Sequence, residues 1–135
     1  MIYMDTLQGT KSCTNLVKCF MSIFVKETFV GRIGGDEFVV FMRKNGSREV
    51  AVSRIESLIK KVEELSFTEM NGKNITISAG MAFAPEHGTG YLDLYKNADT
   101  ALYKTKQNGR DGYNIYEEVK KIKDKGERKR LCLLE

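Results

Sequence analysis

The sequence has few of the residues that mark membrane, disulfide-stabilised or zinc-binding proteins. Its three cysteines, Cys13, Cys19 and Cys132, form no CxxC pair, so it predicts neither a disulfide framework nor a zinc site. No apolar run approaches the roughly 18 residues that a bilayer-spanning helix needs, and the start lacks the layout of a signal peptide. We therefore expect no membrane segment in this chain and a cytoplasmic location.

Histidine is scarcer still. The single one, His87, lies in the stretch 86–90, which is typical of a loop by composition. No serine or cysteine nucleophile pattern and no second ligand lie nearby, so a catalytic role has little support. We expect His87 to be a surface loop residue.

The composition is otherwise that of an ordinary globular domain. The chain has 135 residues, of which 41% are hydrophobic and 30% charged, with one proline and a net charge of +4. This length allows one domain with a single core, which we place at residues 1–118. Residues 119–135 are highly charged with little apolar spacing, so we interpret them as a tail, and we expect no DNA or RNA partner.

The most informative stretch is residues 31–41, where two short apolar runs flank a glycine pair. This pattern predicts a β-hairpin whose tight turn carries acidic groups. Gly34 and Gly35 lack a Cβ, so a phosphate or a base can approach the backbone there. Asp36 and Glu37 follow directly, and carboxylate oxygens are ligands that Mg²⁺ prefers. The alternative is an ordinary hairpin with solvated acids.

The remaining patterns predict strands and helices that alternate along the chain. The small residues Ser78 and Gly80 further indicate that another element packs closely over their strand. The order predicts an α+β fold with a mainly antiparallel central sheet flanked by helices. The expected elements are a strand at 1–5, helices at 12–24, 47–65 and 92–107, a second hairpin at 67–80 turning at Asn71-Gly72, and a final strand at 113–116.

Three segments resemble one known family in the right order. The segment 32–38, with the sequence Arg-Ile-Gly-Gly-Asp-Glu-Phe, contains the motif for which the GGDEF family of diguanylate cyclases is named. The segment 75–80 resembles the family's TISxG strand, and 98–110 resembles its ADxALYxAKxxGR helix and exit. The chain is identified by this resemblance as a member of the GGDEF family over residues 30–116.

The resemblance implies a ferredoxin-like, nucleotidyl-cyclase-like fold and a specific reaction. In the family, two GTP molecules condense to cyclic di-GMP with release of pyrophosphate, as a bacterial signalling output. The reaction uses Mg²⁺ or Mn²⁺ to neutralise phosphate charge. One domain holds one GTP, so the family acts as a homodimer, and an upstream sensor domain of a longer parent protein is expected.

The resemblance also implies roles for individual residues. Asp5 matches the first metal ligand and Thr6 the residue that lends a backbone carbonyl. Asp36 is expected to hold the metal and take part in catalysis. Glu37 is a candidate to assist deprotonation or to bind a second ion. The implied substrate-binding residues are Gly34, Gly35, Lys106 and Arg110; the alternative for the last two is that they only complement the helix dipole.

Two segments depart from the family pattern. Residues 6–10 replace the family's Phe-Lys and Asn-Asp elements, and the Asn supplied there reads guanine in the family. Residues 25–28 lack the Arg and Asp of the RxxD inhibitory site, so no feedback site for cyclic di-GMP is expected here. The alternative function is a degenerate GGDEF domain that binds GTP or serves as a regulatory interaction module. An RNA-binding module of ferredoxin-like topology is disfavoured, because the hairpin offers acids where exposed aromatics are needed.

Overall fold

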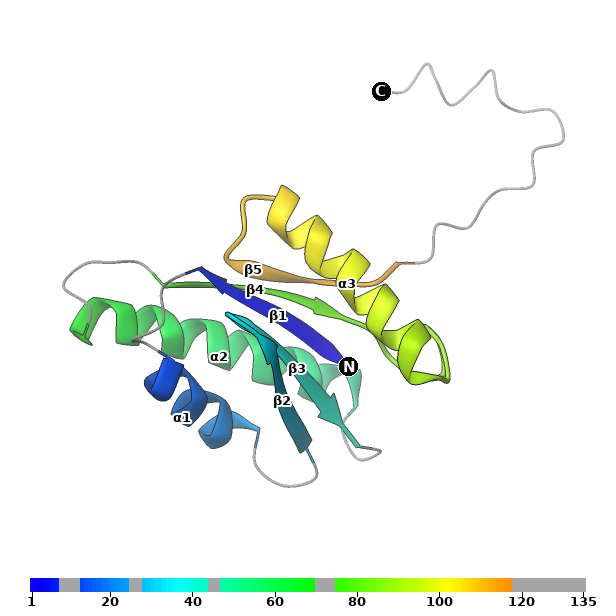
Figure 1. The fold of residues 1–135 in the computed structure, drawn as a ribbon, viewed down its shortest axis with the longest axis horizontal. Coiled ribbons are helices and arrows are strands. Elements are labelled where there is room, and N and C mark those ends of the chain that lie inside the picture. Colours follow the sequence, from blue (N-terminus) through cyan, green and yellow to red (C-terminus); the bar gives the residue numbers. More distant parts are fainter. Residues whose placement is uncertain (8–12, 25–27, 44–46, 70–74, 118–135) are drawn as a thin grey trace, which may run out of the picture.

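A computed structural model describes residues 1–7, 13–24, 28–43, 47–69 and 75–117 of the chain. These residues form a five-stranded sheet with helices on both faces (Figure 1). The α+β class expected from the sequence is therefore confirmed. In chain order the elements are β1 (Ile2–Leu7), α1 (Cys13–Ile23), β2 (Thr28–Gly34), β3 (Glu37–Met42), α2 (Arg48–Glu69), β4 (Thr76–Met81), α3 (Tyr91–Gln107) and β5 (Gly112–Ile115).

The first strand lies at the centre of the sheet. The strand order is β2-β3-β1-β4-β5, and β1 pairs antiparallel with both β3 and β4. The hairpin strands β2 and β3 are antiparallel as predicted, whereas β4 and β5 run parallel. The sheet is thus mainly antiparallel, and the predicted hairpin pairs directly with β1 through β3.

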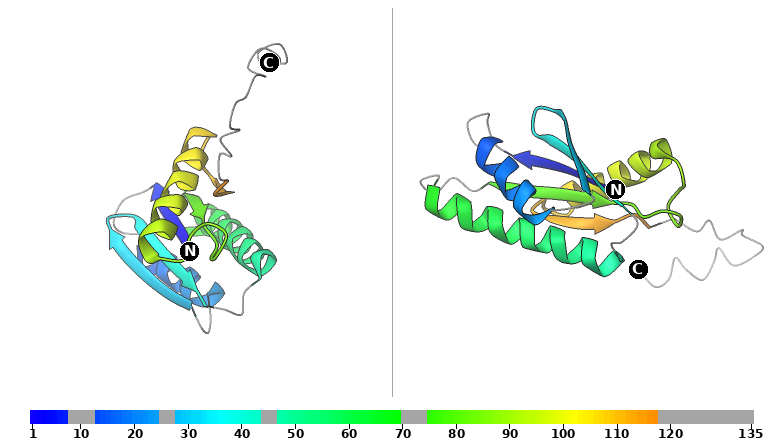
Figure 2. Two further views of the ribbon diagram at one scale, coloured as in Figure 1. Left: turned by 90° about the vertical axis from the view of Figure 1, so that its right-hand side faces the viewer. Right: turned by 90° about the horizontal axis from the view of Figure 1, so that it is seen from below.

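The helices divide the sheet into two faces. α1 and α2 cover one face and α3 covers the other (Figures 1 and 2). Alternate residues of β1 therefore enter different cores, because successive side chains of a strand point to opposite faces. Met4 packs in the large core under α1 and α2, with Phe20, Ile55, Leu58 and Ile77 among its members. Tyr3 packs in the smaller core under α3, with Val39, Ala82, Ala98 and Leu102.

The backbone of α3 lies unusually close to β4. A Cβ built on Gly80 would overlap the carbonyl oxygen of Ala98 and the backbone nitrogen of Leu102. The buried Thr105 fixes the same contact further along the helix, since its hydroxyl donates to the Ala79 carbonyl oxygen at 2.8 Å. The close neighbour that the small residues of this strand predicted is therefore α3.

One predicted element is wrong. The stretch 67–80 was expected to form a second hairpin, but α2 continues to Glu69, so residues 67–69 are helical. β4 pairs instead with β1 and β5. A central strand finds its neighbours from distant parts of the chain, so β4 pairs with β1 and β5 and not with the residues just before it. The predicted turn at Asn71-Gly72 lies outside the described residues.

One side chain differs from expectation in its exposure. His87 is buried, with 9% of its surface exposed, because its Nδ1 accepts a hydrogen bond from the Phe83 backbone N–H at 2.9 Å. The tail at 119–135 lies outside the described residues. In the part of the chain that is described, no helix combines the length and apolarity that crossing a bilayer requires.

The contact at Gly80 makes a stability prediction. We expect Gly80→Ala to destabilise the fold by about 3 kcal/mol, because the clash is with helix backbone, which cannot move aside as a flexible side chain would. The unfolding midpoint in thermal denaturation should fall by on the order of 10 °C. Gly112→Ala is the control, since its nearest non-neighbouring atom would be the Arg110 carbonyl oxygen at 3.9 Å. Equal effects of the two substitutions would contradict the proposed packing constraint.

Thr105 provides a second test of how α3 is held. Besides its bond to Ala79, its Oγ1 accepts a hydrogen bond from Asn114 Nδ2 at 3.0 Å. Thr105→Val removes these bonds at nearly constant volume and should cost about 1–2 kcal/mol in urea denaturation. Thr100→Val on the exposed side of the same helix removes a hydroxyl bonded only to its own helix, at Lys96 O, and should change stability by less than about 0.5 kcal/mol.

Candidate carboxylate site

The turn between β2 and β3 has an irregular geometry that the side chain of Arg32 supports. The pairing register shifts between Arg32 and Gly34, and Gly35 adopts a positive φ of 49°. Arg32 Nε donates a hydrogen bond to the Gly35 carbonyl oxygen at 2.9 Å. A Cβ built on Gly34 or Gly35 would meet no atom within 4 Å, so the space over the turn is open. A ligand can approach the backbone of the turn there.

The central strand brings a second carboxylate to the hairpin. Asp5 of β1 is directly opposite Glu37 of β3, the first residue after the turn. Side chains of directly paired residues on neighbouring strands lie on the same face, with Cβ atoms about 5 Å apart. Asp36 precedes Glu37 in the turn itself and is half-buried. The structure therefore brings Asp5 and Glu37 together, and Asp36 is the chain neighbour of Glu37.

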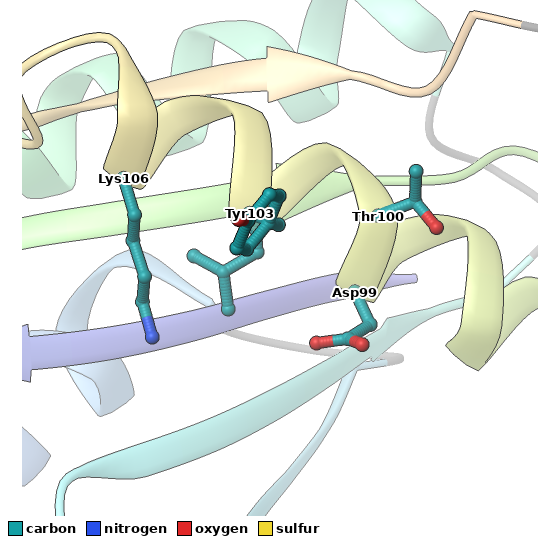
Figure 3. A pocket seen from close by; sticks show the side chains of 5 residues that line it. Asp99, Thr100, Tyr103 and Lys106 are labelled. Carbon is teal, nitrogen blue, oxygen red and sulfur yellow. The ribbon is translucent and has the colours of Figure 1, made fainter.

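A lysine from α3 reaches the same place. Lys106 Nζ lies 2.5 Å from Asp5 Oδ2, and the two side chains are 29% and 23% exposed. Figure 3 shows Lys106 extending from α3 toward the strands. The ion pair joins residues from opposite ends of the described chain at one point on the sheet.

An open hollow lies alongside Lys106. It has a volume of about 330 Å³ and is lined by residues of α3 (Figure 3). Asp99 and Thr100 give it polar walls, and Tyr103, which is 63% exposed, adds an aromatic ring. Its size is at the lower end of the range for small-molecule sites. The hollow thus extends the carboxylate site along α3.

Two further predicted residues lie near this site without a described contact to its carboxylates. Arg110 is exposed in the turn after α3, where it has a positive φ of 62°, and it forms no ion pair with any described residue. Its backbone N–H donates to the Thr105 carbonyl oxygen at 3.0 Å. Thr6 follows Asp5 in β1 and pairs with Ile77 of β4, whereas the register with β3 ends at Asp5.

Sequence reasoning missed Tyr3, which belongs to the same site. Its hydroxyl forms hydrogen bonds with the Glu37 carboxylate and with Tyr95. Burial, followed by these two hydrogen bonds, raises the pKa of the Tyr3 phenol above its usual value. The alternation of a β-strand was the signal that could have found it, because Tyr3 lies two residues before Asp5 and so on the same face.

The donor set fits a divalent cation that is bound partly by the protein and partly by the phosphates of a substrate. Among the described ranges, no group of three or more His, Cys, Asp or Glu side chains is arranged to hold a metal. Asp5 and Glu37 nevertheless supply two carboxylates side by side. Mg²⁺ is usually bound through one or two carboxylates, with waters and substrate phosphates completing its octahedral shell. The site thus suits a metal that arrives with a phosphorylated ligand rather than an all-protein metal cage.

The chain resembles known proteins over most of its length. The family model described as "Diguanylate cyclase, GGDEF domain" matches residues 9–112, a range that begins after β1. A diguanylate cyclase of Vibrio cholerae is 34% identical over 109 residues, which cover 81% of this chain and 33% of that protein. Diguanylate cyclase A of Treponema denticola is 40% identical over 81 residues, which cover 59% of this chain and 22% of that protein. The chain therefore spans a third or less of these curated relatives.

Solved structures share the fold. The active GGEEF domain of a diguanylate cyclase from Vibrio cholerae superposes with a TM-score of 0.73 at 29% identity, covering 87% of this chain and 81% of that one. The GGDEF domain of DgcB from Caulobacter crescentus, solved in complex with c-di-GMP, has a TM-score of 0.67 at 22% identity, covering 85% and 75% of the two chains, and supports the fold alone. Since the family model covers well over half of the sequence, this protein belongs to the GGDEF domain family of diguanylate cyclases.

Proposed function

We propose that this domain condenses two GTP molecules into cyclic di-GMP and releases two pyrophosphates. The observation that carries the proposal is the meeting of Asp5, Glu37 and Lys106 beside an open glycine turn. Two carboxylates and one cation at a single point match the needs of a metal-bound triphosphate. The similarity to the diguanylate cyclases of Vibrio cholerae and Treponema denticola supports the same reaction.

The carboxylates would hold the divalent ion. Asp5 and Glu37 are the side chains that the strand register brings together, and the Thr6 carbonyl and Asp36 are proposed as further ligands. Mg²⁺ or Mn²⁺, when bound, supplies neutralisation of phosphate charge and acidifies the attacking hydroxyl. Glu37 and Asp36 are also the candidate acceptors for the proton of the 3′-hydroxyl, since they lie at the lip of the turn.

The cations and glycines would position the triphosphate. Lys106 already places its ammonium beside a carboxylate, so a phosphate entering with its metal gains a positive partner there. Arg110 lies just beyond the end of the same helix and is proposed as a second phosphate contact. Gly34 and Gly35 leave the turn open to close approach of the nucleotide.

The reaction needs two copies of the domain. Each copy binds one GTP, and the 3′-oxygen of each nucleotide forms a bond to the α-phosphorus of the other while the bond to pyrophosphate breaks. A homodimer with its two sites face to face is therefore proposed as the active state. The much greater length of the curated relatives supports a longer parent protein, in which we place a sensor domain before this one. The domain described here would act on GTP in the cytoplasm.

One observation favours a second candidate, a degenerate domain that binds GTP or a partner without catalysis. The residues at 6–10 do not match the family elements that contact guanine, and no other guanine-reading group was identified in the sequence. In that case Lys106 would serve mainly to neutralise Asp5, as the 2.5 Å ion pair already does. Such a domain would retain the fold and lose turnover.

Product formation separates the two candidates. We expect the purified chain, incubated with GTP and Mg²⁺, to form cyclic di-GMP, measured by liquid chromatography. Asp5→Asn and Glu37→Gln remove proposed metal ligands, and Lys106→Met removes a positive partner of the phosphate, so each should lower the rate by about 100-fold or more. Lys104→Met is the matched control, since Lys104 lies on the same helix but pairs with Glu117 at 3.9 Å. Absence of product from the wild-type chain at high concentration would support the degenerate domain.

The dependence on metal and on protein concentration tests the assembly. Chelation with EDTA should abolish turnover, and added Mg²⁺ or Mn²⁺ should restore it, because the described residues supply too few ligands to retain the ion without substrate. The specific activity should rise with protein concentration until the dimer saturates. A specific activity independent of concentration across the range where light scattering reports a monomer would contradict the two-copy mechanism.

A further inference from the structure

A buried tyrosine contacts one of the two site carboxylates. Tyr3 is 4% exposed and lies in β1 on the face covered by α3, in the smaller core. It is paired with Val39, and Asp5 with Glu37, so Glu37 is the diagonal neighbour of Tyr3 across the strands. The Tyr3 hydroxyl reaches the Glu37 carboxylate along this diagonal and hydrogen-bonds to it. Since a carboxylate only accepts, Tyr3 is the donor in this bond.

Tyr95 of α3 contacts the ring and the hydroxyl of Tyr3. Tyr95 hydrogen-bonds to the Tyr3 hydroxyl, and the two ring centroids are 5.2 Å apart. Tyr95 in turn stacks on Tyr91, at 6.0 Å, and Tyr91 stacks on Phe41 of β3, at 5.5 Å. A ring fixed by such a continuous row of aromatic contacts has little freedom to rotate away from its partner. The direction in which Tyr3 presents its hydroxyl is therefore set by α3.

The same helix thus acts on both carboxylates, on Asp5 directly and on Glu37 through Tyr3. Lys106 forms an ion pair with Asp5. Tyr95 hydrogen-bonds to the Tyr3 hydroxyl, which in turn donates a hydrogen bond to Glu37. A carboxylate has two oxygens and about four acceptor positions, so one hydrogen bond fixes its orientation and leaves the other oxygen available. Hydrogen bonds of this kind to a metal ligand typically affect metal affinity by about 10–100-fold.

We propose that Tyr3, supported by Tyr95, is a positioning residue that orients the Glu37 carboxylate toward Asp5 for metal and nucleotide binding. The inference rests on the proposed function, because it assigns Glu37 to the metal site. It adds a residue that contacts neither metal nor nucleotide and acts through the orientation of Glu37. Removal of the Tyr3 hydroxyl would allow Glu37 to turn away from Asp5, whereas the packing of the ring would remain.

Metal binding in the absence of turnover tests this role. The probe is Mn²⁺ with the α,β-methylene analogue of GTP, which cannot react, and free Mn²⁺ is measured by electron paramagnetic resonance. We expect Tyr3→Phe to weaken Mn²⁺ binding by about 10-fold. Tyr113→Phe is the matched control, since its hydroxyl also bonds to a glutamate, Glu56, at 2.9 Å, and neither residue belongs to the site. It should leave Mn²⁺ binding unchanged.

A double substitution distinguishes positioning from general packing. In a Glu37→Gln background, Tyr3→Phe should produce no further loss of Mn²⁺ affinity, because its effect passes through that carboxylate. An equal loss in both backgrounds would overturn the proposal, as would wild-type affinity in Tyr3→Phe. Tyr95→Phe should also weaken Mn²⁺ binding, but by less. If thermal denaturation shows that Tyr3→Phe does not fold, Tyr95→Phe takes its place in the comparison of the two backgrounds.

The failure of the proposed function would look different. A wild-type domain that binds no Mn²⁺ with the nucleotide analogue would overturn the assignment of the metal site and the role of Tyr3 with it. Wild-type binding that Tyr3→Phe leaves unchanged would overturn the role of Tyr3 alone and leave the metal site in place.

Discussion

The direct contact between α3 and β4 is the constraint on which the candidate site depends. Gly80 allows the helix backbone to rest on the strand, and Thr105 ties the helix to Ala79 at the next turn. Because the helix lies so close, Lys106 reaches Asp5 on the neighbouring strand β1. A bulkier residue at Gly80 would lift the helix from the sheet and withdraw its side chains from both carboxylates. Fold stability and site geometry therefore share one packing contact.

The site itself is costly for the sheet. Like charges that are directly opposite on neighbouring strands destabilise the pairing, and Asp5 and Glu37 occupy such positions. The structure offsets this repulsion with a different partner for each carboxylate: the ammonium of Lys106 for Asp5 and the Tyr3 hydroxyl for Glu37. These compensating contacts keep two acids side by side, as the proposed cation site requires.

How well the sequence predicted the structure depended on the range of the interactions involved. The β2–β3 hairpin and the long helix α3 were predicted because their signals, a glycine pair and an apolar periodicity, are local. The predictions for His87 and residues 67–69 were wrong because long-range or specific contacts decided them. His87 packs against the ring of Tyr116, far along the chain, at a centroid distance of 5.4 Å. Residues 67–69 continue α2 and do not form the expected strand.

The sequence by itself determined the acidic glycine turn, the family motifs and the identities of the residues proposed to bind metal and phosphate, since these follow from residue type and spacing along the chain. Only the tertiary structure decided which of them meet. The strand order placed Asp5 opposite Glu37 rather than Asp36, and the seating of α3 on Gly80 brought Lys106 to Asp5. It also joined Tyr3 and Tyr95 to the site. The physical reason is that a β-sheet brings together residues far apart in sequence through its register, which no local pattern records.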